Sequence, residues 1–190
     1  MTTINVTGYH GTHLRNVTSI LKHAFTANER KDHWLGQGIY FYDNFELAKW
    51  WIETKLHAPS GAGCAVIEVA LGCQKKEFLD LDQPRGVDYF LSELSKLLDQ
   101  LQIGLKFMVS REDDSMRNLC FGIDLVKKHL DIKLVAMTFY KAHPSYAEGD
   151  INLFEKQYFL LPRSFSYKER QICASVNDII LSKKCVHPEN

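Results

Sequence analysis

The chain has 190 residues, of which 45% are hydrophobic and 24% are charged, and its formal net charge at pH 7 is zero. These values are ordinary for a globular protein, and a chain of this length fits one domain with a sizeable core. The zero net charge excludes a whole-protein field that draws the chain to nucleic acid or to an anionic membrane, but it does not exclude a local basic patch.

Neither the N-terminal residues nor the apolar segments of the chain predict export or membrane insertion. The opening MTTINVTGYHG has no charged leader and no long apolar run, so it predicts no signal peptide. No stretch approaches the roughly 20 apolar residues that span a bilayer. The five cysteines are odd in number, widely scattered and form no CxxC pair, which is typical of reduced thiols in a cytosol. We therefore expect one soluble cytoplasmic domain.

The N-terminal third predicts two strand–helix units separated by a polar loop. Hydrophobic alternation indicates strands, apolar spacing of three and four indicates helices, and Asn44 is a suitable N-cap. In chain order the predicted elements are a strand at 4–9 that ends at His10-Gly11-Thr12, a helix from Leu14 to Phe25, a loop at 26–33, a strand at 38–42 and a helix from Phe45 to about Leu56.

The rest of the chain predicts further strands around a helical insertion at about 85–130. The cleanest amphipathic helix carries a stripe of apolar residues from Val87 to Leu101. In chain order we predict strands at 64–71 and 78–81, helices at 87–101 and 116–130, a strand at 134–140, a long connection at 143–168, and strands at 172–176 and 179–181. The mixture predicts an α+β fold, and a connection of that length is usually functional or mobile.

Two short motifs suggest chemistry. Tyr9-His10-Gly11-Thr12 lies at the end of the first predicted strand, and Gly36-Gln37-Gly38-Ile39-Tyr40-Phe41 enters the second. Glycine lets a ligand approach the backbone closely, and a tyrosine beside a glycine turn offers a flat face for a planar ligand. Each motif alone is more often structural, and the pair at this spacing changes the balance.

The pair resembles the first two motifs of the diphtheria-toxin and poly(ADP-ribose) polymerase-like ADP-ribosyltransferases, and Ala48 to Trp51 resembles the helix that follows them. The resemblance covers the N-terminal residues, and the middle third does not align. It implies split central β-sheets flanked by helices and NAD as the co-substrate. It also implies that the strand histidine, the glycine after it, the turn tyrosine and a late glutamate hold NAD. The NAD-binding residues are then His10, Gly11, Thr12, Gly38, Tyr40 and Tyr42.

Elementary chemistry gives each residue a role in such a site. The Tyr40 ring stacks on the nicotinamide, and Tyr42, two residues along the same strand face, forms the opposite wall. The backbone of Gly11 pairs with the carboxamide. His10 hydrogen-bonds a ribose hydroxyl and orients the ribose without acting as a base. A carboxylate beneath the ribose stabilises the positive charge that develops as the glycosidic bond breaks.

Two late segments compete for the carboxylate, because Glu155-Lys156-Gln157 and Glu169-Arg170-Gln171 both read Glu-x-Gln before an apolar run. We favour the second, whose strand is bounded more clearly. In many relatives the glutamate directly precedes the apolar strand, and Gln171 occupies that slot here. Either Glu169 supplies the carboxylate or the enzyme works with an amide. The departure disfavours chain elongation of poly(ADP-ribose) and favours a single transfer.

The remaining candidates have plainer interpretations. The HxxH spacing of His10 and His13 lacks accompanying ligands, so we predict no metal site. The lysine pairs at 75–76, 127–128 and 183–184 are expected to be solvated surface. The leucine stripe at 87–101 is expected to be core packing unless a partner covers it. Of Trp50 and Trp51, one is expected to face the core and the other to make a partly exposed contact.

The predicted function is a NAD-dependent mono-ADP-ribosyltransferase that acts on a protein or nucleic acid. The resemblance suggests a bacterial toxin-like effector, and a toxin that consumes NAD needs an inhibitory, antitoxin-like partner in its own cell. The alternative is a non-catalytic NAD- or ADP-ribose-binding module. An RNA 2′-phosphotransferase shares this general fold, but the chain lacks a matching set of His and Arg motifs.

Overall fold

The computed structural model describes residues 2–27, 33–55, 63–101, 112–141 and 167–187. The competing Glu155 segment and most of the predicted long connection lie outside these residues. Seven strands form one sheet in the order β4-β5-β6-β2-β1-β3-β7. The strands are β1 (Thr3–His13), β2 (Ile39–Tyr42), β3 (Cys64–Gln74), β4 (Phe78–Asp80), β5 (Leu134–Lys141), β6 (Tyr167–Ala174) and β7 (Ile180–His187).

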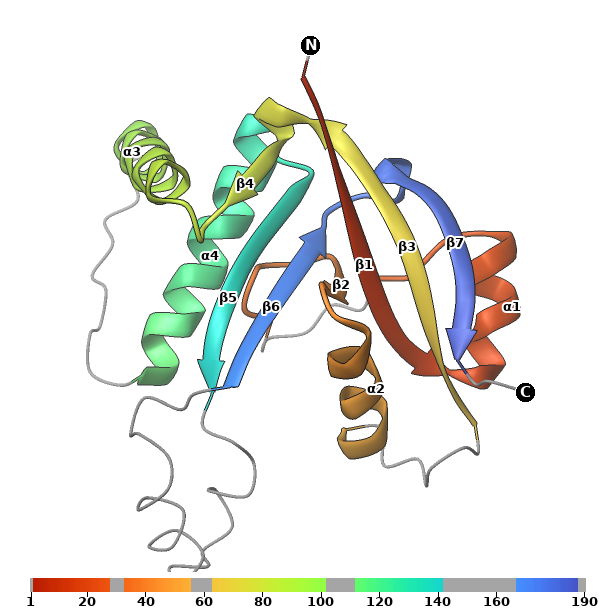
Figure 1. Cartoon of the computed structure of the whole chain (residues 1–190). Coiled ribbons are helices and arrows are strands. Elements are labelled where there is room, and N and C mark those ends of the chain that lie inside the picture. Colours follow the sequence, from red (N-terminus) through yellow and green to blue (C-terminus); the bar gives the residue numbers. More distant parts are fainter. Residues whose placement is uncertain (1, 28–32, 56–62, 102–111, 142–166, 188–190) are drawn as a thin grey trace, which may run out of the picture.

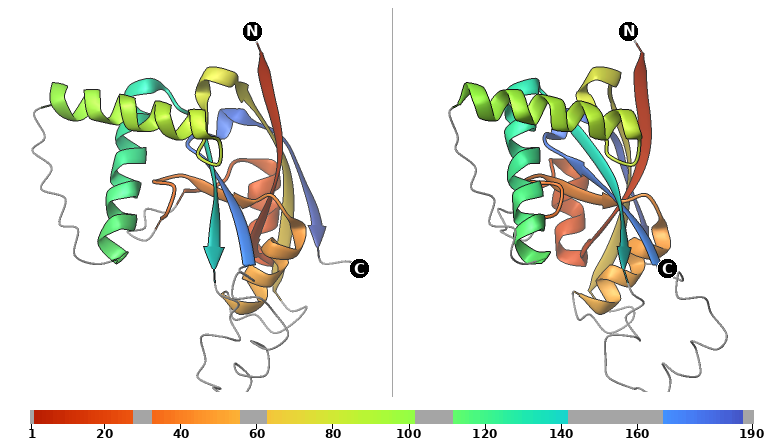
Figure 2. Two further views of the ribbon diagram at one scale, coloured as in Figure 1. Left: turned by 60° about the vertical axis from the view of Figure 1, so that its left-hand side comes forward. Right: turned by 90° about the vertical axis from the view of Figure 1, so that its left-hand side faces the viewer.

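Four α-helices of the described residues pack around this sheet, so the architecture is a mixed α/β single domain (Figure 1). They are α1 (Leu14–Lys22), α2 (Phe45–Thr54), α3 (Pro84–Gln100) and α4 (Glu112–Leu130). Helices α3 and α4 connect β4 to β5, which are parallel neighbours, and Figure 2 shows α3 crossing α4 beyond that edge of the sheet. Of the helices described, none combines the length and apolar character needed to cross a bilayer.

Several predicted boundaries are confirmed, and four strands (β1, β3, β6 and β7) are longer than expected. Asn44 caps α2 as predicted, because its Oδ1 accepts a hydrogen bond from the Glu46 N–H at 2.8 Å. Strand β1 does not end at His10, since it pairs with β3 along its whole length as far as His13 opposite Cys64. Strand β6 begins at Tyr167, five positions before the prediction, so Glu169 lies inside a strand.

Three apolar clusters hold the layers together. The first lies under α1 and includes Phe41 and Ile172, and the second lies between the sheet and the pair α3–α4 and includes Cys173. The third lies under α2 and includes Ala48 and Val66. Neighbours along a strand, such as Ile172 and Cys173, fall in different clusters because successive strand residues face opposite sides. Both faces of the central strands are therefore buried.

The amphipathic stripe of α3 is only partly core. Phe90 and Leu97 are buried against the second cluster, whereas Val87, Leu91 and Leu101 are exposed. The prediction of core packing is therefore confirmed for Phe90 and Leu97, and for the exposed residues the alternative that a partner covers them stays open.

The sheet has one weak seam. Strands β1 and β2 share a single residue pair, Tyr9 opposite Tyr42. The described strands are hydrogen-bonded into one sheet, whereas the resemblance implies split sheets. The β1–β2 junction has the fewest paired residues of any neighbouring strands in this sheet.

Candidate functional site

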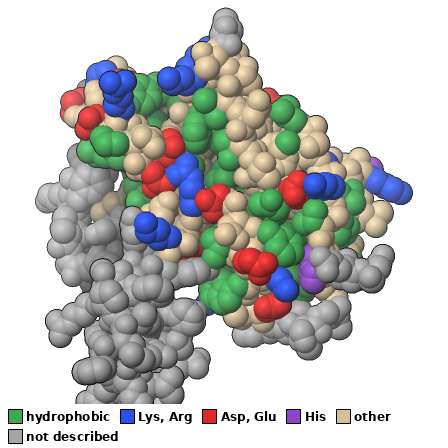
Figure 3. Space-filling model, in the orientation of Figure 1, with side chains coloured by type: hydrophobic (Ala, Val, Ile, Leu, Met, Phe, Trp, Pro, Cys, Tyr) green, Lys and Arg blue, Asp and Glu red, His purple; other side chains and the backbone are tan. Residues whose placement is uncertain are grey.

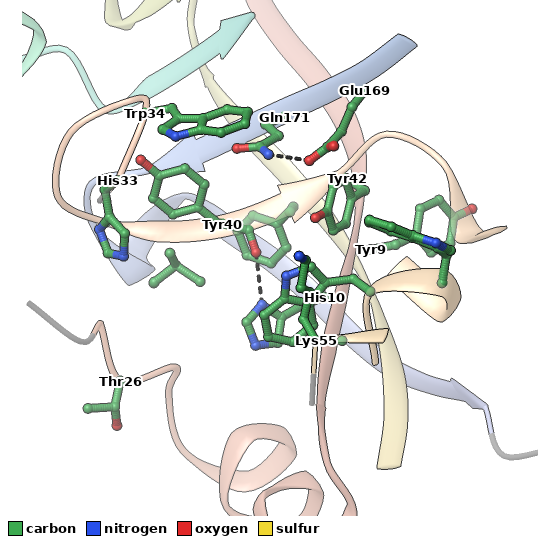
Figure 4. Close-up of a pocket in the computed structure, with 16 residues that line it drawn as sticks. Tyr9, His10, Thr26, His33, Trp34, Tyr40, Tyr42, Lys55, Glu169 and Gln171 are labelled. Carbon is green, nitrogen blue, oxygen red and sulfur yellow. Dashed lines mark hydrogen bonds between the residues drawn. The ribbon is translucent and has the colours of Figure 1, made fainter. Parts of the chain in front are cut away.

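A cavity of about 560 Å³ lies at this seam, lined by side chains of β1, β2, β6 and α2 (Figure 4). It contains seven of the residues that the sequence singled out, namely His10, Gly11, Gly38, Tyr40, Tyr42, Glu169 and Gln171. Thr12 does not line it. This residue is buried, and its Oγ1 accepts a hydrogen bond from Asn16 Nδ2 at 3.3 Å, and its predicted contact with NAD stays a prediction.

The topology explains why residues so distant in sequence meet here. In the sheet β6 neighbours β2, and β2 neighbours β1, so the three motif-bearing strands lie side by side. Tyr40 pairs with Cys173 and Tyr42 with Gln171, so these side chains share one face with Glu169. His10 packs on the other face, and the cavity is reached from both faces because it lies at the seam.

His10 is fixed by a hydrogen bond and by aromatic contacts. Its Nδ1 donates to the carbonyl oxygen of Tyr40 at 2.8 Å, bridging β1 and β2 where their ladder ends. The ring packs edge-on against Phe25 and Phe41, with centroids 5.0 and 5.8 Å away. Burial lowers the pKa of His10, so the ring is neutral near pH 7. A neutral ring that donates from Nδ1 presents Nε2 as an acceptor.

Tyr40 is held by its own hydroxyl group. That hydroxyl accepts a hydrogen bond from the Leu35 N–H at 2.8 Å and donates one to the Gly36 carbonyl at 2.7 Å. Burial raises the pKa of Tyr40 far above its ordinary value, so the phenol stays protonated and keeps both bonds. The ring also contacts His33 with a centroid distance of 4.8 Å. Its position is therefore set by the turn that precedes it.

Two glycines shape this turn for different reasons. Gly36 has φ of +73°, the left-handed region that favours glycine. At Gly38 an added Cβ would lie 2.6 Å from the Ala174 carbonyl oxygen and from Cys173 Sγ, so the backbone of β2 approaches β6 too closely for a side chain. The Gly-x-Gly motif thus has a structural reason in addition to any ligand.

Gly11 also has a packing reason that the sequence did not reveal. An added Cβ there would lie 2.4 Å from Ile52 Cγ2 and 3.0 Å from the Ala48 carbonyl oxygen. The absence of a side chain lets α2 rest directly on β1. The predicted pairing of the Gly11 backbone with a carboxamide stays a prediction.

Glu169 is the buried acid of the cavity. Its side chain is 1% exposed, and its Oε1 accepts a hydrogen bond from Gln171 Nε2, which Figure 4 marks with a dashed line. Both residues project from the same face of β6, as the Glu-x-Gln pattern predicts. The amide therefore orients the carboxylate, and the two groups act as one unit.

The wall opposite β6 consists of residues from α2. Trp50, Trp51 and Lys55 line the cavity, as do His33 and Trp34 ahead of the glycine turn. Trp51 packs against the third apolar cluster, and Trp50 is partly exposed, which confirms the prediction that one tryptophan faces the core and the other makes a partly exposed contact. Sequence reasoning did not assign Trp34 or Lys55 to the site. The position of the tryptophan pair one turn beyond Ala48, which packs on Gly11, is the signal that connects α2 with the site.

Lys127 contradicts the prediction that the lysine pairs are plain surface. Its side chain is 9% exposed, and its Nζ donates to the carbonyls of Leu35 at 2.7 Å and Gln37 at 2.9 Å. The helical period contains the missed signal, because Lys127 shares the apolar face of α4 with Ile123 and Leu130. Its neighbour Lys128 is exposed, as predicted.

The charges of the described residues identify neither a metal nor a polyanion site. Within the ranges that the structure describes, no group of three or more metal-ligating side chains occurs. On the face shown in Figure 3, basic and acidic side chains are interspersed among hydrophobic ones. This surface gives no electrostatic preference between a protein and a nucleic acid as a partner.

Comparisons with known proteins give one distant relative. No family model and no solved structure matches the chain. An uncharacterized protein of Methanocaldococcus jannaschii is 31% identical over 84 residues, which are 43% of this chain and 39% of that protein. The chain thus matches about two fifths of the length of this relative, and the similarity brings no activity with it.

Proposed function

We propose that the protein transfers a single ADP-ribose from NAD to a macromolecular acceptor, either a protein or a nucleic acid. One observation carries the proposal. His10 and Tyr40, which the resemblance to ADP-ribosyltransferases assigns to NAD, line one cavity with Glu169, the candidate acid that we favour, and the three residues come from three adjacent strands. Unrelated core residues have no reason to converge on a concave site with a buried acid.

The cavity suits the nicotinamide riboside end of NAD. Its volume of about 560 Å³ is in the range of small-molecule sites. Tyr40 and Tyr42 offer aromatic faces to the nicotinamide ring, which is cationic in NAD. Nε2 of a neutral His10 accepts a hydrogen bond from a ribose hydroxyl, so the histidine orients the sugar.

Glu169 acts when the bond between nicotinamide and ribose breaks. The bonding electron pair leaves with nicotinamide, and positive charge develops on the ribose. A carboxylate in a buried site stabilises that charge more strongly than it would in water. Gln171 keeps the carboxylate in place through its hydrogen bond. A nucleophilic oxygen or nitrogen of the acceptor then bonds to the ribose carbon from which nicotinamide has departed, and its proton passes to water.

The pair Glu169–Gln171 favours one transfer over chain growth. Gln171 occupies the slot where many relatives have the glutamate, and an amide does not deprotonate an incoming hydroxyl. We further propose an ADP-ribosyltransferase-like fold with α3–α4 as an insertion, and a toxin-like effector of the cytoplasm that has an inhibitory partner. These points rest on the resemblance and on the five free cysteines.

Gln171 also favours a second candidate, a module that binds NAD or ADP-ribose without chemistry. A site that has an amide in place of the usual acid retains hydrogen bonding but loses part of the electrostatic stabilisation. The two candidates share the cavity and differ only in whether nicotinamide is released.

Labelled NAD separates them. The purified chain is incubated with NAD labelled in its adenylate phosphate and with a cell lysate, and the products are treated with protease or with nuclease. We expect label on a macromolecule, with the digestion that removes it identifying the acceptor class, and no label with Glu169→Gln. Binding of NAD by calorimetry without transfer or nicotinamide release would support the module, and the absence of binding would overturn both.

A further inference from the structure

Helix α4 reaches the cavity through the turn that carries Tyr40. Lys127 is buried, and its ammonium group donates to the carbonyls of Leu35 and Gln37 and lies 3.2 Å from Cys173 Sγ on β6. One side chain thus connects the helix, the turn and the strand that contains the buried acid.

Asp124, one helical turn earlier, binds the same segment. Its Oδ1 accepts a hydrogen bond from the Gln37 N–H at 2.7 Å. An added Cβ at Gly36 would lie 2.2 Å from that oxygen, so the carboxylate lies directly against the turn backbone. Side chains three residues apart on a helix share one face, so Asp124 and Lys127 can both hydrogen-bond to the same turn.

The turn depends on these outside partners. Gly36 is left-handed, and the polar groups of Leu35, Gly36 and Gln37 are bonded to α4 and to the Tyr40 hydroxyl. The Tyr40 hydroxyl belongs to the same hydrogen-bond network, so the position of the Tyr40 ring depends on how α4 positions the turn.

Burying an ammonium group is a costly way to fill space. A methionine or leucine on the apolar face of α4 would pack without a desolvation penalty. Lys127 offsets that penalty only by donating to acceptors that are arranged for it, and such a network specifies one geometry more strictly than apolar packing does.

We propose that Asp124 and Lys127 are positioning residues of the NAD site, which act by fixing the turn 35–37 and thereby the ring of Tyr40. The proposal rests on the proposed function for the identity of its ligand. The hydrogen bonds that Asp124 and Lys127 make to the turn can be measured without any ligand. Neither side chain lines the cavity, so both act through the turn.

Lys127→Met removes the ammonium group at nearly constant volume. Lys128→Met, the exposed neighbour, controls for charge, and Val126→Ala, a buried position of the same helix, controls for general destabilisation. Two quantities are measured, namely hydrogen exchange of the Leu35 and Gln37 amides and steady-state kinetics with NAD. We expect exchange of the two amides to accelerate about tenfold or more in Lys127→Met and to stay unchanged in the two control variants. We expect kcat/KM to fall about 10- to 100-fold, mainly through KM.

Asp124→Ala is the second variant, because Asp124 is only half-buried and its replacement leaves the core intact. It should release the Gln37 amide specifically. The proposal would be overturned if Lys127→Met and Asp124→Ala showed the same amide exchange rates and the same KM for NAD as the two control variants. Should the wild-type chain neither bind nor cleave NAD, the proposed function fails by itself, and the exchange data alone decide whether α4 clamps the turn.

Discussion

The two walls of the cavity are held by different forces. On the β2–β6 wall, hydrogen bonds fix the functional groups, with Tyr40 bound to the turn and Glu169 to Gln171. On the α2 wall, close packing does this work, because Ile52 and Trp51 rest against the bare backbone of Gly11. Hydrogen bonds specify direction, whereas packing specifies separation. Under the proposed function, the first wall would supply the chemistry and the second would set the width of the slot.

Glu169→Gln should give the largest effect, because it alters the chemistry of the first wall without altering its shape. We expect kcat for NAD cleavage to fall about 100-fold or more with little change in KM, since the charge matters most as the bond breaks. Glu155→Gln, in the competing Glu-x-Gln segment, is the matched control and should behave like wild type. Activity lost in Glu155→Gln and kept in Glu169→Gln would move the third motif to the earlier segment.

Tyr40→Phe tests whether hydrogen bonds hold the first wall. The change leaves the Leu35 N–H and the Gly36 carbonyl without the hydroxyl, which should cost about 1–3 kcal/mol of unfolding free energy. Tyr40→Ala should in addition lower NAD affinity by about 1–3 kcal/mol through the lost ring. Denaturant unfolding and calorimetry measure the two quantities, with the exposed Tyr89→Phe as control. A Tyr40→Phe protein as stable as Tyr89→Phe would show that the turn does not need the hydroxyl.

Gly11→Ala tests packing on the second wall. The new Cβ meets Ile52 Cγ2 at 2.4 Å, so α2 must shift, at a cost of about 1–3 kcal/mol. Ile52→Leu removes that methyl group at constant volume, so the cost of Gly11→Ala should be smaller in this background. A double-mutant cycle in denaturant checks this coupling. Strict additivity would mean that the contact does not limit the approach of α2.

The pH dependence of His10 is the smallest expected effect. Burial lowers its pKa in the folded state, so the unfolded chain takes up the proton first, near pH 6.5. The contribution of the neutral ring to stability is complete above about pH 6.5 and is lost as the pH falls toward the folded pKa. His10→Gln should remove this slope, measured by unfolding between pH 7 and 5.

NAD affinity should follow the same proton, since only the neutral ring presents Nε2 as an acceptor. We expect it to weaken only as the pH falls through the lowered pKa of His10 in the folded protein, which lies below about pH 6.5. A limb of the kcat profile centred at or above that value, and absent in His10→Gln, would instead identify His10 as a general base.

The sequence predicted the parts of this site whose signals are local. The strand at Tyr40, the cap at Asn44 and the shared face of Glu169 and Gln171 all follow from short-range spacing. The extent of β1 did not follow, because His10-Gly11-Thr12 resembles a strand end, and only pairing with β3 carries the strand to His13.

A tertiary contact accounts for the other miss. Lys127 has the composition of a surface pair although its helical phase is apolar. Whether a charged side chain on such a face is buried depends on acceptors elsewhere, here the carbonyls of Leu35 and Gln37. Those acceptors are distant in sequence, so no local pattern contains them.

The central claim is that the seam between β1 and β2 is where NAD is bound and cleaved. Chromatographic measurement of the nicotinamide released from NAD by the purified chain, beside Glu169→Gln at matched occupancy, tests it most directly. The account predicts release by the wild-type protein and about 100-fold slower release by a variant that still binds NAD. Equal rates in the two proteins, or no release by a wild-type chain saturated with NAD, would contradict it.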